Sequence, residues 1–147
     1  MQALPHRYVV QSAGRPSGAV TVTPEGVTPL ATDAPPEFGG PEGQWSPESL
    51  LVASVADCYI LSFRAVARAS RLPWETLSVS AEGVLDRVDG VTRFTHFTVF
   101  ATLLVADSSQ ESLARTVMDK AKRACLVTNS LLAPCELKAS VSSLAAA

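Results

Sequence analysis

One stretch of the chain is almost entirely apolar. Within residues 50–67 the run is interrupted at only four positions, Ser54, Asp57, Ser62 and Arg64. Ser46-Pro47-Glu48 precedes this run and is typical of a helix start, because serine accepts hydrogen bonds from first-turn N–H groups and proline suits the first helical position. The pattern predicts a helix over residues 46–71. A soluble helix without a wide polar face is buried on nearly all sides, which one short protomer hardly provides, so we infer an interlocked homodimer.

Two later stretches alternate between apolar and polar residues with a period of two. They cover residues 77–85 and 93–103, and Asp89-Gly90 between them has the chemistry of a tight turn. The alternation predicts a long antiparallel hairpin over residues 76–105, with one face covering the apolar helix. Ser108-Ser109-Gln110-Glu111 starts a second predicted helix over residues 108–124, and residues 135–143 predict a last strand.

The region before the apolar helix is rich in turn-forming residues. Short strand-like segments flank Gly14, Pro16 and Gly18, so residues 1–32 are predicted to form a β-hairpin region. Residues 33–45 are rich in proline, glycine and acidic side chains and predict a long ordered loop, a kind of loop that often carries function. Strands and helices do not alternate as βαβ units, which indicates an α+β fold in a single domain, residues 1–147.

Composition narrows the classes of function. The 147 residues carry a net charge of −2 without a cluster of lysine or arginine, so we expect neither nucleic acid nor an acidic membrane surface as a partner. No run reaches the ~20 uninterrupted apolar residues of a membrane span, and residues 1–10 lack the charged start and apolar middle of a secretory signal. We therefore expect a cytoplasmic protein. Three cysteines without metal-ligand spacing predict no metal site and no bound cofactor, and favour a transient, redox-linked disulfide.

The candidate chemistry of the chain is carried by Cys58 and Cys125. Cys58 lies inside the apolar helix and Cys125 just past the second helix, so only the fold can bring them together. Taken alone, each has an ordinary interpretation, because buried cysteines are commonly small packing residues. Cys135, which follows Pro134, is interpreted in this way. A buried thiol has a raised pKa and is a poor nucleophile at neutral pH, so we expect a cationic group to offset its burial.

Several of these residues together resemble the OsmC/Ohr family of thiol-dependent peroxidases. The matching features are Ser46-Pro47-Glu48-Ser49-Leu50, Cys58 ten positions after Glu48, Cys125-x-x-Thr128-Asn129, and the turn Ala13-Gly14-Arg15-Pro16-Ser17-Gly18. The resemblance implies an intertwined homodimer with two long central helices wrapped by antiparallel sheets. It also implies reduction of organic hydroperoxides to alcohols without a metal or cofactor, and recharging by a dithiol reductant such as a lipoyl-bearing protein.

Carried over by position, the resemblance implies a role for each residue. Cys58 resembles the peroxidatic cysteine that becomes a sulfenic acid, and Cys125 the resolving cysteine that converts it into a Cys58–Cys125 disulfide. Arg15 resembles the activating arginine, and Glu48 the acid that orients Arg15. An ideal helix places Glu48 about 15 Å along the axis from Cys58, so its partner is Arg15 rather than the thiol. Leu126 departs from the family pattern, in which a proline often follows the second cysteine.

Phe38 and Trp45 flank the long loop and have two interpretations. They are either packing residues at the helix start or apolar walls that bind the substituent of a hydroperoxide. His6 and His96 have no acidic or serine partner at suggestive spacing, so a Ser-His-Asp hydrolase is poorly supported. The alternative to a peroxidase is a non-catalytic protein of the same dimeric fold that binds an apolar small molecule at the dimer interface.

Overall fold

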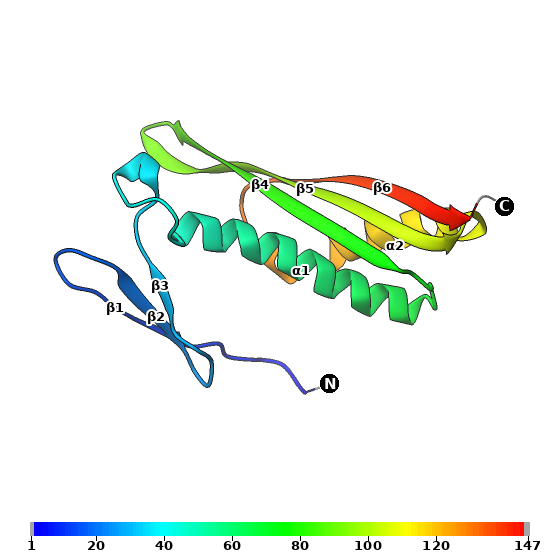
Figure 1. Ribbon diagram of the computed structural model, residues 1–147, viewed down its shortest axis with the longest axis horizontal. Coiled ribbons are helices and arrows are strands. Elements are labelled where there is room, and N and C mark those ends of the chain that lie inside the picture. Colours follow the sequence, from blue (N-terminus) through cyan, green and yellow to red (C-terminus); the bar gives the residue numbers. More distant parts are fainter. Residues whose placement is uncertain (1, 146–147) are drawn as a thin grey trace. The chain divides into compact units, whose positions relative to one another are not determined.

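The computed structural model describes residues 2–145. It divides into two compact units, Met1–Leu51 and Val52–Ala147, each with one three-stranded sheet. Figure 1 shows the order of the helices and strands along the chain. The mixture of helices with two separate sheets confirms the predicted α+β class.

The first unit contains an antiparallel sheet in the order β1-β2-β3. Its strands and the short helix after them are β1 (Val10–Ala13), β2 (Val20–Pro24), β3 (Leu30–Thr32) and η1 (Pro36–Phe38). Gly18 and Gly26 lie in the two connections with positive φ, a conformation that glycine adopts without steric cost. The sequence predicted the β1–β2 hairpin, whereas β3 has three residues and is too short to give a period-two signal.

Helix α1 (Pro47–Ala69) begins and ends with well-defined caps. The backbone N–H of Ser49 donates to Oγ of Ser46 at 3.2 Å, and the N–H of Ser46 donates to Oγ of Ser49 at 2.9 Å. This reciprocal pair satisfies N–H groups that the first turn leaves free. At the other end Arg71 adopts φ 52°, and the N–H of Leu72 donates to the carbonyl of Ala67 at 3.0 Å, which closes the helix as a Schellman motif.

Only one stripe of α1 is fully buried within the protomer. It consists of residues spaced four apart, Val55, Tyr59, Phe63 and Ala67, all at most 1% exposed. Leu61, on another side of the helix, is 51% exposed. One protomer therefore does not bury α1 on nearly all sides, as the sequence analysis expected, because it packs only one helix face on its sheet. By length and composition α1 would also be sufficient to span a membrane, which a count of uninterrupted apolar residues did not reveal.

The second unit is built on a sheet in the order β4-β5-β6. The first two strands, β4 (Thr76–Val88) and β5 (Val91–Asp107), form the predicted antiparallel hairpin. They are joined by Asp89 and Gly90, whose φ values of 51° and 79° match a turn that follows the twist of the strands.

The last strand, β6 (Cys135–Ala145), runs parallel to β5. The helices between them are η2 (Ser108–Gln110), α2 (Glu111–Ala124) and α3 (Leu126–Asn129). The prediction of antiparallel sheets is thus wrong for this pair, and so is the prediction that no βαβ unit occurs. The helical segment returns the chain to the starting end of β5, and this kind of crossover makes the next strand parallel.

The core of the second unit lies between one face of the sheet and the two helices (Figure 1). Alternate residues of β5 point into it, namely Phe97, Val99, Ala101, Leu103 and Val105, each at most 2% exposed. Helix α2 contributes Ala114, Val117, Met118 and Ala121, all fully buried. The buried hydroxyl of Tyr59 donates to the carbonyl of Met118 at 3.3 Å and links α1 to α2. This link sets Cys58, the neighbour of Tyr59, beside the segment that follows α2.

Candidate active site

The fold brings Cys58 and Cys125 into direct contact. Cys58 is half-buried in α1, and Cys125 is the residue that ends α2, with its side chain 1% exposed. The thiol of Cys125 donates a hydrogen bond to the sulfur of Cys58. Both cysteines are free thiols in this structure. The two side chains lie close enough for each to shift the pKa of the other.

The sulfur of Cys58 accepts hydrogen bonds from several neutral groups. The donors are the backbone N–H groups of Leu126 and Val127 and the Cys125 thiol. The Ser62 hydroxyl lies one helical turn further along α1 at 4.0 Å and donates when Cys58 is ionised. Burial raises the pKa of the Cys58 thiol, but these hydrogen bonds to the anionic sulfur outweigh burial and leave the pKa below its ordinary value. Cys58 is therefore the thiol of the pair that ionises first.

Cys125 is shifted in the opposite direction. Burial raises the pKa of its thiol, and the neighbouring Cys58 raises it further. Hydrogen bonding by Thr128 lowers the pKa of Cys125 but does not compensate for these two effects. Because Cys58 is less buried and has more donors, we assign the thiolate to Cys58 and the proton to Cys125 in the resting pair.

The segment that supplies these donors is held in place by its own hydrogen bonds. The N–H of Asn129 and the Thr128 hydroxyl donate to the carbonyl of Cys125 at 3.1 and 3.3 Å. The side-chain amide of Asn129 donates to the carbonyl of Arg123 at 3.0 Å. The Thr128 and Asn129 side chains thus fix the turn that directs the N–H groups of Leu126 and Val127 toward Cys58.

The sequence identified the two cysteines as candidate site residues but missed four groups that shift their pKa values. These are Ser62, Thr128 and the backbone N–H groups of Leu126 and Val127. The proximity of Ser62 to Cys58 was predictable, because a residue four positions after Cys58 lies on the same helix face. Thr128 was identified only as part of the family motif Cys125-x-x-Thr128-Asn129. The backbone donors had no signal, since their direction depends on where α1 and the turn meet.

Leu126, the departure from the family pattern, has a consequence for this donor set. Leucine has a backbone N–H, and that N–H donates to Cys58, whereas proline has none. We predict that Leu126→Pro raises the pKa of Cys58 and slows its alkylation at neutral pH about threefold to tenfold, the usual net value of one hydrogen bond. Proline suits the first helical position, and Cys125 already has the extended conformation that precedes it. An unchanged pH profile of iodoacetamide alkylation would remove the Leu126 N–H from the site.

The Ser62 hydroxyl gives an independent test of the same donor set. We predict that Ser62→Ala also slows alkylation of Cys58 at neutral pH, by about threefold to tenfold, because one donor to the thiolate is lost. The matched control is Ser112→Ala, a serine-to-alanine change at an exposed position of α2, which should leave the profile as in the unmodified chain. Equal profiles for Ser62→Ala and the control would show that the 4.0 Å contact does not act on the thiol.

The other predicted site residues belong to the first unit, whereas both cysteines belong to the second. Arg15 is exposed between β1 and β2, Glu48 is half-buried in the first turn of α1, and Phe38 and Trp45 are 59% and 46% exposed. In the described part of the chain Arg15 and Glu48 form no ion pair, and Oε2 of Glu48 is buried without a hydrogen-bond partner. The assignment of these four residues to Cys58 stays a prediction.

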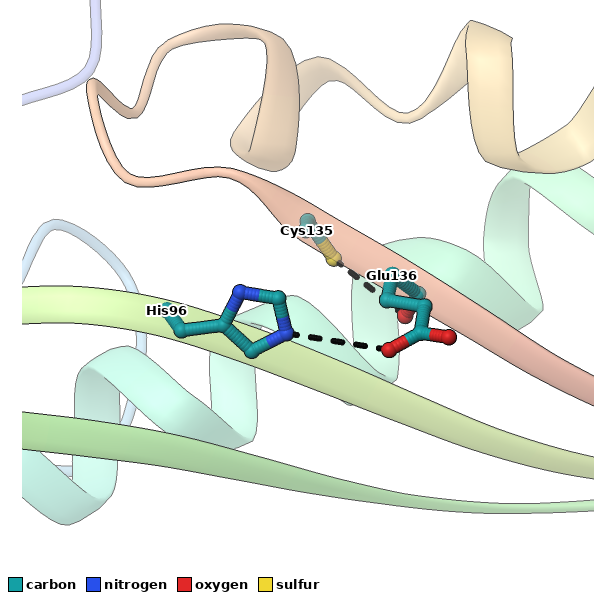
Figure 2. Close-up of polar contacts among 3 residues, drawn as sticks. All are labelled: His96, Cys135 and Glu136. Carbon is teal, nitrogen blue, oxygen red and sulfur yellow. Dashed lines mark hydrogen bonds and ion pairs between the residues drawn. The ribbon is translucent and has the colours of Figure 1, made fainter.

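Cys135 and His96 lie on neighbouring strands of the second unit. Figure 2 shows His96 of β5 and Glu136 of β6 directed toward each other, with 3.9 Å between Nε2 and Oε2. Both side chains are well exposed, and pairs of this kind contribute ~0–1 kcal/mol to stability. The sequence did not indicate this acidic partner because Glu136 lies far along the chain from His96. The thiol of Cys135 donates weakly to the carbonyl of Glu136 at 3.9 Å, and burial raises its pKa.

Metal ligands do not gather anywhere in the described residues. No group of three or more histidine, cysteine, aspartate or glutamate side chains that could hold a metal ion occurs in this part of the chain. The second unit contains a thiol pair in which the pKa of Cys58 is lowered and the pKa of Cys125 is raised.

Comparison with known proteins shows the family of this chain. A family model described as OsmC-like protein matches residues 39–140, which is well over half of the chain. The chain therefore belongs to the OsmC-like protein family, as the residues quoted above indicated. Among curated proteins, the uncharacterized protein YmaD of Bacillus subtilis is 29% identical over 109 residues, which cover 71% of each chain.

Solved structures agree with this assignment. An organic hydroperoxide resistance protein OsmC from Legionella pneumophila is 26% identical, with a TM-score of 0.74 over 96% of this chain and 99% of that chain. An OsmC-like protein of unknown function from Vibrio cholerae superimposes with a TM-score of 0.84 at 18% identity, covering 92% and 100%. The organic hydroperoxide resistance protein OhrB of Bacillus subtilis gives a TM-score of 0.67 at 17% identity, covering 93% and 98%. The two more distant structures establish the fold alone.

Proposed function

We propose that this protein is a thiol-dependent peroxidase that reduces organic hydroperoxides to alcohols. The observation that carries the proposal is the contact between Cys58, whose pKa is lowered, and Cys125, whose pKa is raised and whose thiol donates to Cys58. A peroxidase needs a thiolate at neutral pH and a second thiol within reach of the oxidised first one. Membership of the OsmC-like family, and the name of the 26% identical structure from Legionella pneumophila, support a role in hydroperoxide resistance.

The proposed reaction has two chemical steps and a recharging step. The Cys58 thiolate attacks the terminal oxygen of the hydroperoxide, the O–O bond breaks, and Cys58 becomes a sulfenic acid while an alcohol leaves. Cys125 then attacks the sulfur of Cys58 and forms the Cys58–Cys125 disulfide with release of water. A dithiol reductant, such as a lipoyl group on a protein, restores both thiols by exchange. Neither step uses a metal or cofactor.

Arg15 and Glu48 have supporting roles in this proposal. A guanidinium stays charged when partly buried and donates both to a thiolate and to a carboxylate. The buried Oε2 of Glu48 has no partner in the described residues and is therefore an available acceptor for such a group. We propose that Glu48 orients Arg15 toward Cys58, and that Phe38 and Trp45 bind the apolar substituent of the peroxide.

Substitution of Arg15 tests this assignment. We predict that Arg15→Ala lowers the peroxidase rate with cumene hydroperoxide about 10²-fold, because an electrostatic donor at the reacting sulfur is lost. Arg15 is exposed in a connection between strands, so the melting temperature should remain as in the unmodified protein. Arg7→Ala is a matched control, since Arg7 is also exposed and precedes the first sheet. A rate within twofold of the unmodified protein would remove Arg15 from the mechanism.

We further propose that the protein is a cytoplasmic homodimer. Support comes from α1, which is apolar on several sides while only the stripe from Val55 to Ala67 is fully buried in one protomer. A second copy that covers the exposed side chains, such as Leu61, would remove apolar surface from water. Sedimentation equilibrium at micromolar concentration tests this proposal, and a monomer there would count against it.

One experiment tests the central proposal. The reduced protein is treated with one equivalent of cumene hydroperoxide, and its cysteines are mapped by non-reducing peptide mass spectrometry. A Cys58–Cys125 disulfide that dihydrolipoamide reverses is the expected result. Free thiols at both positions would instead favour the alternative, a non-catalytic protein that binds an apolar molecule.

A further inference from the structure

The proposed reaction leaves one proton without an assigned source. When the Cys58 thiolate attacks the terminal oxygen, the other oxygen departs as an alkoxide. An alkoxide is about as basic as hydroxide and is a far stronger base than a thiolate. Expelling such a base is slow unless a positioned acid protonates it as the bond breaks. The question is which group near the Cys58 sulfur holds a proton that is acidic enough.

The candidate acids are the groups around Cys58 in the described residues, and these groups differ in acidity. The groups that contact the sulfur are the N–H groups of Leu126 and Val127, the Ser62 hydroxyl and the Cys125 thiol. Amide N–H groups and hydroxyls do not ionise in the pH range in which proteins work, whereas the ordinary pKa of a cysteine thiol is ~8.5. The Cys125 thiol thus holds the most acidic proton of this set. With 1% exposure, Cys125 is also shielded from bulk water.

We propose that Cys125 acts twice in one turnover, first as the general acid that protonates the leaving oxygen and then as the resolving nucleophile. This inference rests on the proposed peroxidase function. In the first step the S–O bond forms, the O–O bond breaks, and the proton passes from the Cys125 sulfur to the leaving oxygen. The products are the Cys58 sulfenic acid, the alcohol and the Cys125 thiolate. In the second step that thiolate attacks the Cys58 sulfur, the S–S bond forms, the S–O bond breaks, and hydroxide leaves into the solvent, where a buffer acid protonates it to water.

The contacts of Cys125 suit both roles. Before the reaction, burial and the neighbouring Cys58 raise the pKa of the Cys125 thiol, so its proton is present when the peroxide arrives. After the attack Cys58 has lost its negative charge, and that part of the increase disappears. The N–H of Thr128, which lowers the pKa of Cys125, then remains to stabilise the new thiolate. The resolving thiolate is therefore formed when a sulfenic acid is present for it to attack.

The test compares two oxidants that differ in their need for an acid. Tert-butyl hydroperoxide expels a strongly basic alkoxide, whereas peracetic acid expels acetate, which leaves without a proton. The first-turnover loss of the Cys58 thiol is measured by rapid quench and mass spectrometry at one pH. Each rate is divided by the rate of iodoacetamide alkylation of Cys58 in the same variant, which reports the thiolate alone. The variants are Cys125→Ala and Cys125→Ser, and the control is Cys135→Ala, which removes a thiol outside the pair.

The expected result is a loss that depends on the leaving group. In Cys125→Ala the normalised rate with tert-butyl hydroperoxide should fall about 10²-fold, while the rate with peracetic acid stays within about threefold. Cys125→Ser should behave in the same way, because a hydroxyl is a far weaker acid, and it keeps the test available if the alanine variant folds poorly. The same fractional loss with both oxidants, or no loss with either, would overturn the inference. No oxidation of Cys58 by either oxidant in the unmodified protein would instead overturn the proposed function itself.

Discussion

Replacing Cys58 by serine should abolish peroxidase turnover. We expect Cys58→Ser to lower the rate with cumene hydroperoxide by ~10³-fold or more, because removal of a covalent nucleophile leaves only the weak contributions of binding. A serine hydroxyl stays protonated at neutral pH, so the hydrogen bonds that lower the pKa of Cys58 have no anion to stabilise. The measurement is the rate of hydroperoxide loss in the presence of dihydrolipoamide.

Two controls make this result specific. Serine is close to cysteine in volume and Cys58 is only half-buried, so the denaturation midpoint of Cys58→Ser should remain near that of the unmodified protein. In the unmodified protein the rate should rise with pH and reach its plateau at a lower pH than for an ordinary cysteine, because the thiolate form prevails above a lowered pKa. Activity above a tenth of the original in Cys58→Ser would place the nucleophile elsewhere.

Replacing Cys125 by serine should have the second largest effect on turnover, because the disulfide with Cys58 can no longer form. We expect Cys125→Ser to form no intramolecular disulfide and to lose steady-state turnover about 10²-fold, while Cys58 is still oxidised in the first turnover. Without a resolving thiol the sulfenic acid persists, and excess peroxide carries it to the irreversible sulfinic acid. Peptide mass spectrometry after successive additions of cumene hydroperoxide therefore should find sulfinic acid at Cys58 in place of the disulfide.

Cys135→Ser is the matched control for this experiment. Cys135 is a half-buried thiol on β6 with a raised pKa, and we assign it no role in the reaction. The control variant should keep the Cys58–Cys125 disulfide and its turnover. If Cys125→Ser forms a Cys58–Cys135 disulfide and keeps its turnover, the resolving role belongs to Cys135 instead.

The two sheets show how far periodicity predicts a fold. The alternation over β4 and β5, with Asp89-Gly90 between them, predicted a hairpin that the structure contains. The direction of β6 was not predictable in the same way, because an edge strand alternates identically whether it runs parallel or antiparallel to its neighbour. The direction of β6 follows from the crossover through α2, whose Val117 and Met118 pack into the core.

Helix α1 shows that a residue pattern can predict an element without predicting how that element packs. The residue pattern correctly predicted α1 and its start at Ser46, where capping is a local property of adjacent residues. It did not predict which side of α1 the protomer buries, since nearly every side is apolar. Only the tertiary structure distinguishes the buried stripe at Tyr59 from the exposed Leu61.

The sequence by itself determined the chemical inventory of this protein: a cysteine inside an apolar helix, a second one after another helix, and the motif residues that resemble the OsmC/Ohr family. These are properties of residue type and spacing. Only the tertiary structure decided which of the two thiols has the lowered pKa, because a pKa depends on burial and on the direction of nearby donors. The N–H groups of Leu126 and Val127 lie far from Cys58 in the chain, and they lower its pKa only because the fold directs them at its sulfur.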